Sequence, residues 1–116
     1  MTREQRAQQL WSILVLAARN RQVLTYSIVG TACGVPPPSL GDFLRPVQQY
    51  CTENNLPPLT AIIVSEKSGV PGGGCLVDSQ DLPRAYIAIF EKDWPTVTAP
   101  SAAQLADAYT RVPQHI

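Results

Sequence analysis

Three consecutive prolines, Pro36 to Pro38, constrain the fold of this chain more than any other part of its sequence. Each proline lacks a backbone N–H donor and keeps the residue before it out of the helical region. A helix must therefore end before them, at about Gly34, and a new helix can open at Pro38 or Ser39. The sequence thus predicts two helices joined by a tight turn.

Apolar residues recur at helical spacing on both sides of this turn. They predict a first helix from residue 2 to about residue 20. Thr25 can cap a short second helix that ends at Cys33, and a third helix should cover residues 40–53. Because proline interrupts the backbone ladder, Pro46 is expected to kink or divide this third helix near Arg45.

The second half of the chain contains strand and loop signals. Residues 59–64 are apolar and β-branched, which is typical of a buried strand, and residues 75–77 could form a second one. The glycine-rich stretch 65–74 between them resembles a wing, a loop that touches a ligand beside a helix. A fourth helix is expected over residues 81–93, with Asp81 as its cap.

This order of elements predicts an α+β fold of the winged helix-turn-helix type, with a three-helix core, a small β-hairpin and a C-terminal helix. The length of 116 residues suits a single domain. We assign the winged-helix domain to residues 1–94 and an extended tail to residues 95–116. A last short helix over residues 101–109, capped by Ser101, is possible within that tail.

Charge gives little support to strong nucleic-acid binding, because nine basic residues balance nine acidic ones. Residues 1–50 carry a net charge of +3 and the remainder carries −3. Each neutralised phosphate needs a nearby cation, so a protein that binds DNA mainly through phosphates usually has a clearer basic excess.

Cysteine usage and the termini favour a cytoplasmic protein without a cofactor. The three cysteines are an odd number at wide spacing, and the first ten residues are charged rather than signal-like. The only histidine is His115, so no cysteine has an obvious base, and no zinc-binding spacing occurs. The apolar runs are too short to cross a bilayer. We therefore expect no enzyme activity, no metal and no membrane partner.

Three segments carry a resemblance to a known family. The segment 25–34, TYSIVGTACG, is similar to the start of the DNA-binding domain of the O6-alkylguanine-DNA alkyltransferases and alkyltransferase-like proteins. The segment 39–44, SLGDFL, resembles that family's recognition-helix segment, and 56–64, LPPLTAIIV, resembles the approach to its active-site cysteine. The resemblance implies a winged helix that contacts DNA.

The chain departs from that family where the chemistry occurs. Where the family has a Pro-Cys-His-Arg motif, residues 64–67 read VSEK, without the cysteine that accepts the alkyl group or the histidine beside it. The recognition-helix arginine of the family would fall at Pro38. Tyr26 does match the family's tyrosine that presses on the target phosphate. The resemblance therefore implies DNA contact without alkyl transfer.

The candidate contact residues lie on the second helix, the third helix and the wing. Arginine and glutamine side chains can hydrogen-bond guanine and adenine edges, and serine can bind a phosphate. Asp42 argues against this use, because a carboxylate repels phosphates. The candidate residues are Tyr26, Ser39, Asp42, Arg45, Gln48, Gln49, Lys67 and Ser68.

Two functions of different classes fit these residues. The first is a non-catalytic winged-helix protein that binds duplex DNA through the third helix and the wing loop, in some cases as a homodimer. The alternative is a small inhibitor or accessory module, of the kind found in mobile elements, that occupies another protein. The balanced charge, the proline turn and Asp42 favour the alternative.

Overall fold

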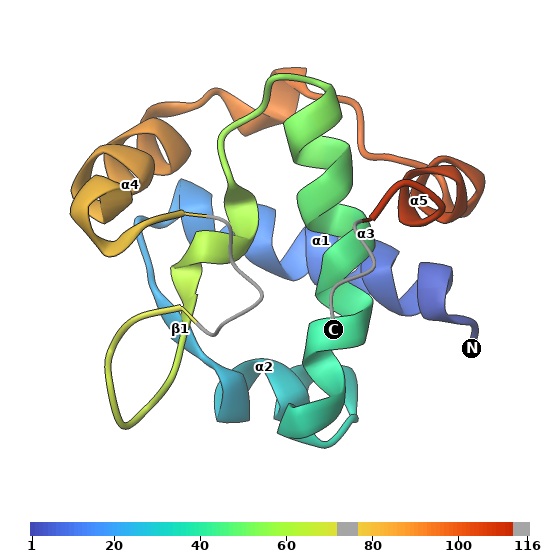
Figure 1. The fold of residues 1–116 in the computed structure, drawn as a ribbon, viewed down its shortest axis with the longest axis horizontal. Coiled ribbons are helices and arrows are strands. Elements are labelled where there is room, and N and C mark those ends of the chain that lie inside the picture. The colour runs from blue at the N-terminus through green and yellow to red at the C-terminus, as the bar shows by residue number, and fades with distance from the viewer. Residues whose placement is uncertain (72–76, 113–116) are drawn as a thin grey trace.

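The first helix supplies much of the core. In the structure, a computed structural model that describes residues 1–71 and 77–112, α1 spans Arg3–Arg19 (Figure 1). Thr2 caps it, because its hydroxyl accepts a hydrogen bond from the backbone N–H of Gln5, whose side chain accepts one from Thr2 N–H in return. Its apolar face is buried at Leu10 and Leu14. The predicted first helix is confirmed.

The second helix, α2, spans Tyr26–Cys33 and matches its predicted ends. The Thr25 hydroxyl accepts the backbone N–H of Ile28 at 3.2 Å. Gly34 ends the helix with a left-handed backbone, φ 72°, which glycine adopts without steric cost. Arg6 of α1 donates a hydrogen bond to the carbonyl of Cys33, so that a cation lies at the negative end of α2.

The proline turn joins α2 to α3 and packs closely against α2. A single turn of 3₁₀ helix, η1 (Pro37–Ser39), leads directly into α3 (Leu40–Glu53). A Cβ atom on Gly30 of α2 would lie 2.8 Å from the carbonyl oxygen of Val35 in the turn. Only glycine fits there without displacing the backbone, so this residue fixes how α2 meets the turn.

Pro46 does not divide the third helix, which was one of the two outcomes expected of it. α3 continues through Pro46 as one helix, and Pro46 itself is buried. A proline inside a helix removes one hydrogen bond, but Leu44 and Val47 on either side of it are also buried in the core. We infer that this packing offsets the missing bond and keeps the helix whole.

The sheet differs from the predicted hairpin. β1 (Leu24–Thr25) pairs in parallel with β2 (Ile63–Val64), with Leu24 opposite Ile63. The predicted strand over residues 59–64 is correct only for its last two residues, because Leu59–Ile62 forms a 3₁₀ turn, η2. Residues 75 and 76 of the other predicted strand lie outside the described residues, and Val77 lies in a bend. The fold is therefore of the α+β class, with a small parallel sheet.

The segment that follows the sheet packs against α1. A 3₁₀ turn, η3 (Ser79–Asp81), precedes α4 (Leu82–Glu91), and the Asp81 side chain does not form the predicted cap. Another 3₁₀ turn, η4 (Trp94–Thr96), follows. The indole N–H of Trp94 donates to the carbonyl of Ile89 at 2.7 Å, and its ring meets the edge of Trp11.

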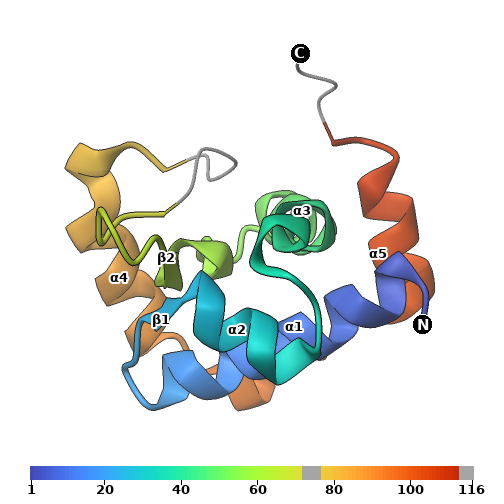
Figure 2. The same cartoon turned by 90° about the horizontal axis from the view of Figure 1, so that it is seen from below.

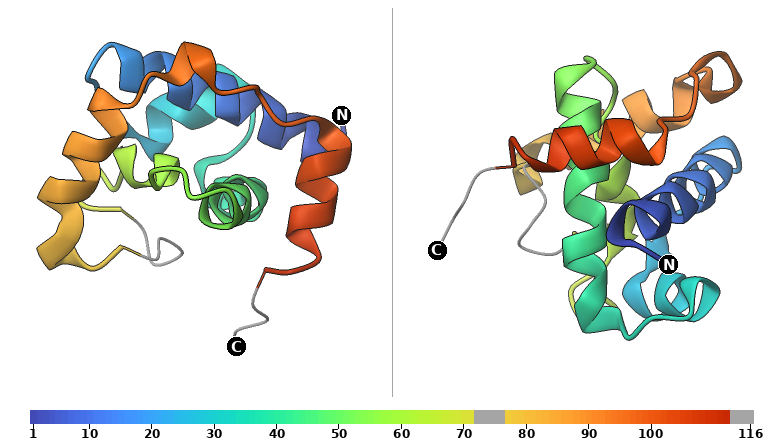
Figure 3. Two further views of the ribbon diagram at one scale, coloured as in Figure 1. Left: turned by 90° about the horizontal axis from the view of Figure 1, so that it is seen from above. Right: turned by 90° about the vertical axis from the view of Figure 1, so that its right-hand side faces the viewer.

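The last helix, α5 (Ala102–Tyr109), confirms the predicted short helix and its Ser101 cap. Ser101 and Gln104 form a capping box. Leu105 and Ala108 are buried, and α5 packs against both α1 and α3. In the right panel of Figure 3, α5 crosses in front of α3. This part of the predicted tail thus belongs to the same core as residues 1–94.

Candidate functional site

The third helix has one side packed in the core and one side that no other helix or strand covers among residues 1–71 and 77–112. Leu40, Val47 and Cys51 are buried where α3 packs against α1. In Figure 2, where α3 is seen nearly along its axis, α1 lies below it, η2 to its left and α5 to its right. We call the remaining side the open face of α3. Its residues are spaced three and four apart and are Gly41, Arg45, Gln48, Gln49 and Thr52.

Asp42, at one edge of the open face, is held by three helices. Arg3 of α1 donates from Nε to Oδ2 at 3.0 Å, and the hydroxyl of Tyr109 of α5 donates to Oδ1 at 3.0 Å. Arg45 lies one turn further along α3, with Nη1 3.7 Å from Oδ1. We call Asp42, Arg3, Arg45 and Tyr109 the Asp42 cluster.

The electrostatics of the Asp42 cluster favour the charged form of the Asp42 carboxyl group. Partial burial acts to raise the pKa of Asp42, but the hydrogen bonds from Arg3 and Tyr109 outweigh it, so the pKa lies below its ordinary value. The hydrogen bond to Asp42 raises the pKa of Arg3, whose guanidinium carbon also lies 4.1 Å from the centre of the Tyr109 ring. Asp42 is thus an ionised structural contact.

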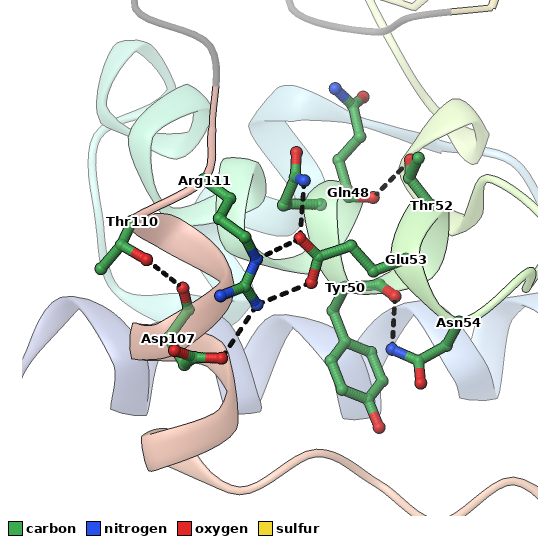
Figure 4. A network of polar contacts seen from close by, with 9 residues as sticks. Gln48, Tyr50, Thr52, Glu53, Asn54, Asp107, Thr110 and Arg111 are labelled. Carbon is green, nitrogen blue, oxygen red and sulfur yellow. Dashed lines mark hydrogen bonds and ion pairs between the residues drawn. The ribbon is translucent and has the colours of Figure 1, made fainter.

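A second cluster joins the far end of α3 to the end of α5 (Figure 4). Arg111 donates from Nε and Nη2 to the two carboxylate oxygens of Glu53, at 2.5 and 2.8 Å, and Nη2 also reaches Asp107 at 2.9 Å. The amide of Gln49 donates to Glu53 at 2.9 Å. These bonds, first that from Arg111 and then that from Gln49, lower the pKa of Glu53 to about 2. We call Glu53, Arg111, Asp107 and Gln49 the Glu53 cluster.

The predicted contact residues of α3 therefore differ in their surroundings. Gln48 accepts a hydrogen bond from the hydroxyl of buried Thr60 at 3.2 Å, and Gln49 belongs to the Glu53 cluster. Ser39 is exposed and forms no side-chain cap on α3. Arg45 has a side chain 55% exposed, beside Asp42. Gln48, Gln49 and Arg45 share the open face, and Ser39 precedes it.

Three predicted residues lie away from the open face. Tyr26, at the start of α2, is partly buried and packs against the core. Lys67 and Ser68 are exposed in the loop 65–71, which closes on itself because the N–H of Ser65 donates to the carbonyl of Val70 at 2.9 Å. In Figure 2, β2 and η2 lie between this loop and α3. The rest of the predicted wing, residues 72–74, lies outside the described residues.

Sequence reasoning missed the residues that contact α3 from other elements. Arg3, Tyr109 and Arg111 come from the two ends of the chain, and no local pattern links them to α3. One signal was present on α3 itself. Asp42, Gln49 and Glu53 are seven and four residues apart, so they form a polar stripe, which indicates that this side of the helix faces another polar element.

The two described cysteines are not activated as nucleophiles. Burial raises the pKa of the Cys51 thiol to about 11, although a hydrogen bond from the Leu59 backbone acts in the opposite direction, and burial also raises the pKa of Cys33. Both thiols are therefore protonated at neutral pH. In the part of the chain that the structure describes, no three histidine, cysteine or carboxylate side chains gather as metal ligands.

Among the described helices, none combines the length and the apolar character that a bilayer crossing requires. Comparison with protein-family models, with curated proteins and with solved structures found no match for this chain.

Proposed function

We propose that this chain is a non-catalytic winged-helix protein that binds duplex DNA through the open face of α3. The observation that carries the proposal is the open face itself. It presents Arg45, Gln48 and Gln49 along one side of a helix whose opposite side is fixed to α1. These side-chain types form hydrogen bonds with guanine and adenine edges in a groove.

The way α3 is held supports this use. A helix that binds in a groove must be presented rigidly, and α3 follows a turn whose Val35 lies close to Gly30 of α2. Ser39 lies exposed at the start of the helix, where a hydroxyl can bind a phosphate. In this proposal the loop 65–71, with Lys67 and Ser68, serves as the wing beside the same duplex.

The resemblance to alkyltransferase-like proteins also supports the proposal. It includes the Thr25 to Gly34 segment, which forms the cap, the body and the glycine end of α2. The residues 64–67 that replace the alkyl-accepting motif contain no cysteine, and the described thiols are buried and protonated. Binding without alkyl transfer is therefore the function that we infer.

The salt dependence of binding reports how many phosphates the protein neutralises. Arg45 is assigned to base edges, so Lys67 is the cation of the predicted contact set that would neutralise a phosphate. The plot of log binding constant against log salt concentration should then have a slope of about −1. A steeper slope would indicate that cations outside this set take part.

Fluorescence anisotropy with a labelled duplex of mixed sequence at low salt tests the proposal. We expect saturable binding that the double variant Arg45→Ala, Lys67→Ala weakens strongly. The matched control is Arg84→Ala, Lys92→Ala, which removes the same charge from exposed positions in and after α4. Absence of binding by the native chain, or equal weakening by both double variants, would contradict the proposal.

One observation favours the alternative of a protein-binding inhibitor or accessory module. The exposed surface of α2 and the proline turn is uncharged, and it includes Ile28, whose side chain is 56% exposed. Its members are Ser27, Ile28, Thr31, Ala32, Pro36, Pro37 and Pro38. An Ile28→Glu variant separates the two functions, because it should leave duplex binding through α3 unchanged but disrupt a protein interface centred on α2.

A further inference from the structure

The contacts of Asp42 suggest a role beyond holding the fold together. A single carboxylate on α3 contacts side chains from α1, α3 and α5, and two of those side chains are arginines. An uncharged amide could accept the hydrogen bond from Tyr109 equally well. What the carboxylate adds is negative charge beside Arg3 and Arg45, and Arg45 lies on the face that we propose for DNA.

This charge has a direct consequence for phosphate binding. Arg45 lies 3.7 Å from the carboxylate, so an approaching phosphate must compete with Asp42 for the same guanidinium. The carboxylate also stays ionised at neutral pH, because Arg3 and Tyr109 donate hydrogen bonds to its two oxygens. A neutral acceptor on a guanine edge suffers less repulsion from the carboxylate than a charged phosphate does.

We propose that Asp42 is a specificity-determining residue, which pairs with Arg45 and thereby suppresses sequence-independent binding of the DNA backbone. The inference rests on the proposed function and adds to it the role of a residue that sequence reasoning placed against DNA binding. Arg3 and Tyr109 also donate hydrogen bonds to the carboxylate, from α1 and α5. In this binding mode, the negative charge of Asp42 balances the positive charge of Arg45.

The test compares Asp42→Asn with the native chain in the anisotropy titration. Asparagine keeps the size of the side chain and can still accept from Tyr109, but it removes the ion pairs with Arg3 and Arg45. Exposed ion pairs are weak, so we expect affinity for a random duplex to rise by about threefold. The salt slope should become steeper by about one, because one more cation neutralises a phosphate.

Three matched variants distinguish this role from a structural one. Asp93→Asn removes the same charge from an exposed residue before η4 and should leave the slope unchanged. Tyr109→Phe loosens the contact between α5 and Asp42 without changing charge, so the slope should also stay as in the native chain. In an Arg45→Ala background, Asp42→Asn should have no effect on affinity.

Each outcome has a distinct meaning. If the native chain binds DNA and Asp42→Asn binds with the same affinity and slope, the role of Asp42 is overturned while the proposed function stands. The same holds if Asp93→Asn or Tyr109→Phe reproduces the change. If neither the native chain nor Asp42→Asn binds duplex DNA at low salt, both the inference and the proposed function fail.

Discussion

The two sides of α3 serve different purposes. The side toward α1 buries Leu40 and Val47 completely, whereas the open face carries polar side chains that are partly or fully exposed. Between them lie Asp42 and Glu53. Tyr109, at the end of α5, contacts Asp42, and Arg111, just after α5, contacts Glu53. The difference teaches that the polar residues of a presented helix are not all available to a ligand, because those at its edge can bind the protein itself.

We expect the largest effect of mutation on the buried side of α3. Leu40→Ala should lower the free energy of unfolding by about 2 to 5 kcal/mol, since a fully buried leucine leaves a cavity when it is truncated. Urea denaturation followed by circular dichroism measures this. Leu16→Ala on α1, where the side chain is 59% exposed, is the control and should cost less than about 0.5 kcal/mol. Equal losses would mean that the packing of α3 is misassigned.

The edge of the helix should show an intermediate effect. Asp42→Ala removes the acceptor for both Arg3 and Tyr109, so we expect a loss of about 1 kcal/mol of unfolding free energy, reduced by solvent screening. The same urea titration reports it. An Asp42→Ala chain as stable as the native one would show that the Asp42 cluster does not help to hold α5 on α3.

The Glu53 cluster should respond to pH rather than strongly to mutation. The pKa of Glu53 in the folded chain, about 2, lies below the ordinary value of 4.5, so the ionised form of Glu53 stabilises the folded chain. The contribution of Glu53 is therefore complete above about pH 4.5 and is lost as the pH falls toward about 2. We expect the difference in Tm between the native chain and Glu53→Gln to narrow over that interval.

The exposed setting of this cluster makes the effect small and sensitive to salt. Glu66→Gln, which removes an exposed carboxylate from the loop 65–71, is the matched control. Its Tm difference from the native chain should not follow the pH dependence of Glu53→Gln. A Glu53→Gln difference that widens on acidification would show that the bonds from Arg111 and Gln49 do not stabilise the ionised form.

These contrasts also explain what the sequence could predict. Thr25, Gly34 and the three prolines act on their own neighbours in the chain, so the ends of α2 and the start of α3 followed from local rules. The pairing of Leu24 with Ile63 joins segments far apart in the chain, and a two-residue strand carries almost no pattern. The hairpin that local reasoning suggested was therefore not the sheet that the described chain forms.

The candidate site followed the same rule. Arg45, Gln48 and Gln49 were predicted to lie on the third helix, and in the structure they are part of α3. The role of Asp42 depends on Arg3 and Tyr109, which are 39 and 67 residues away along the chain. Spacing on α3 could not reveal those partners, because tertiary packing alone brings both termini of the described chain to this helix.

The most direct test of DNA binding by the open face of α3 is to follow backbone amide NMR signals while a duplex is added. We predict that the signals of Arg45, Gln48 and Thr52 shift first, together with those of the loop 65–71, while the signals of α4 stay in place. Shifts confined to α4, or to Ile28 and the rest of α2, would contradict this account.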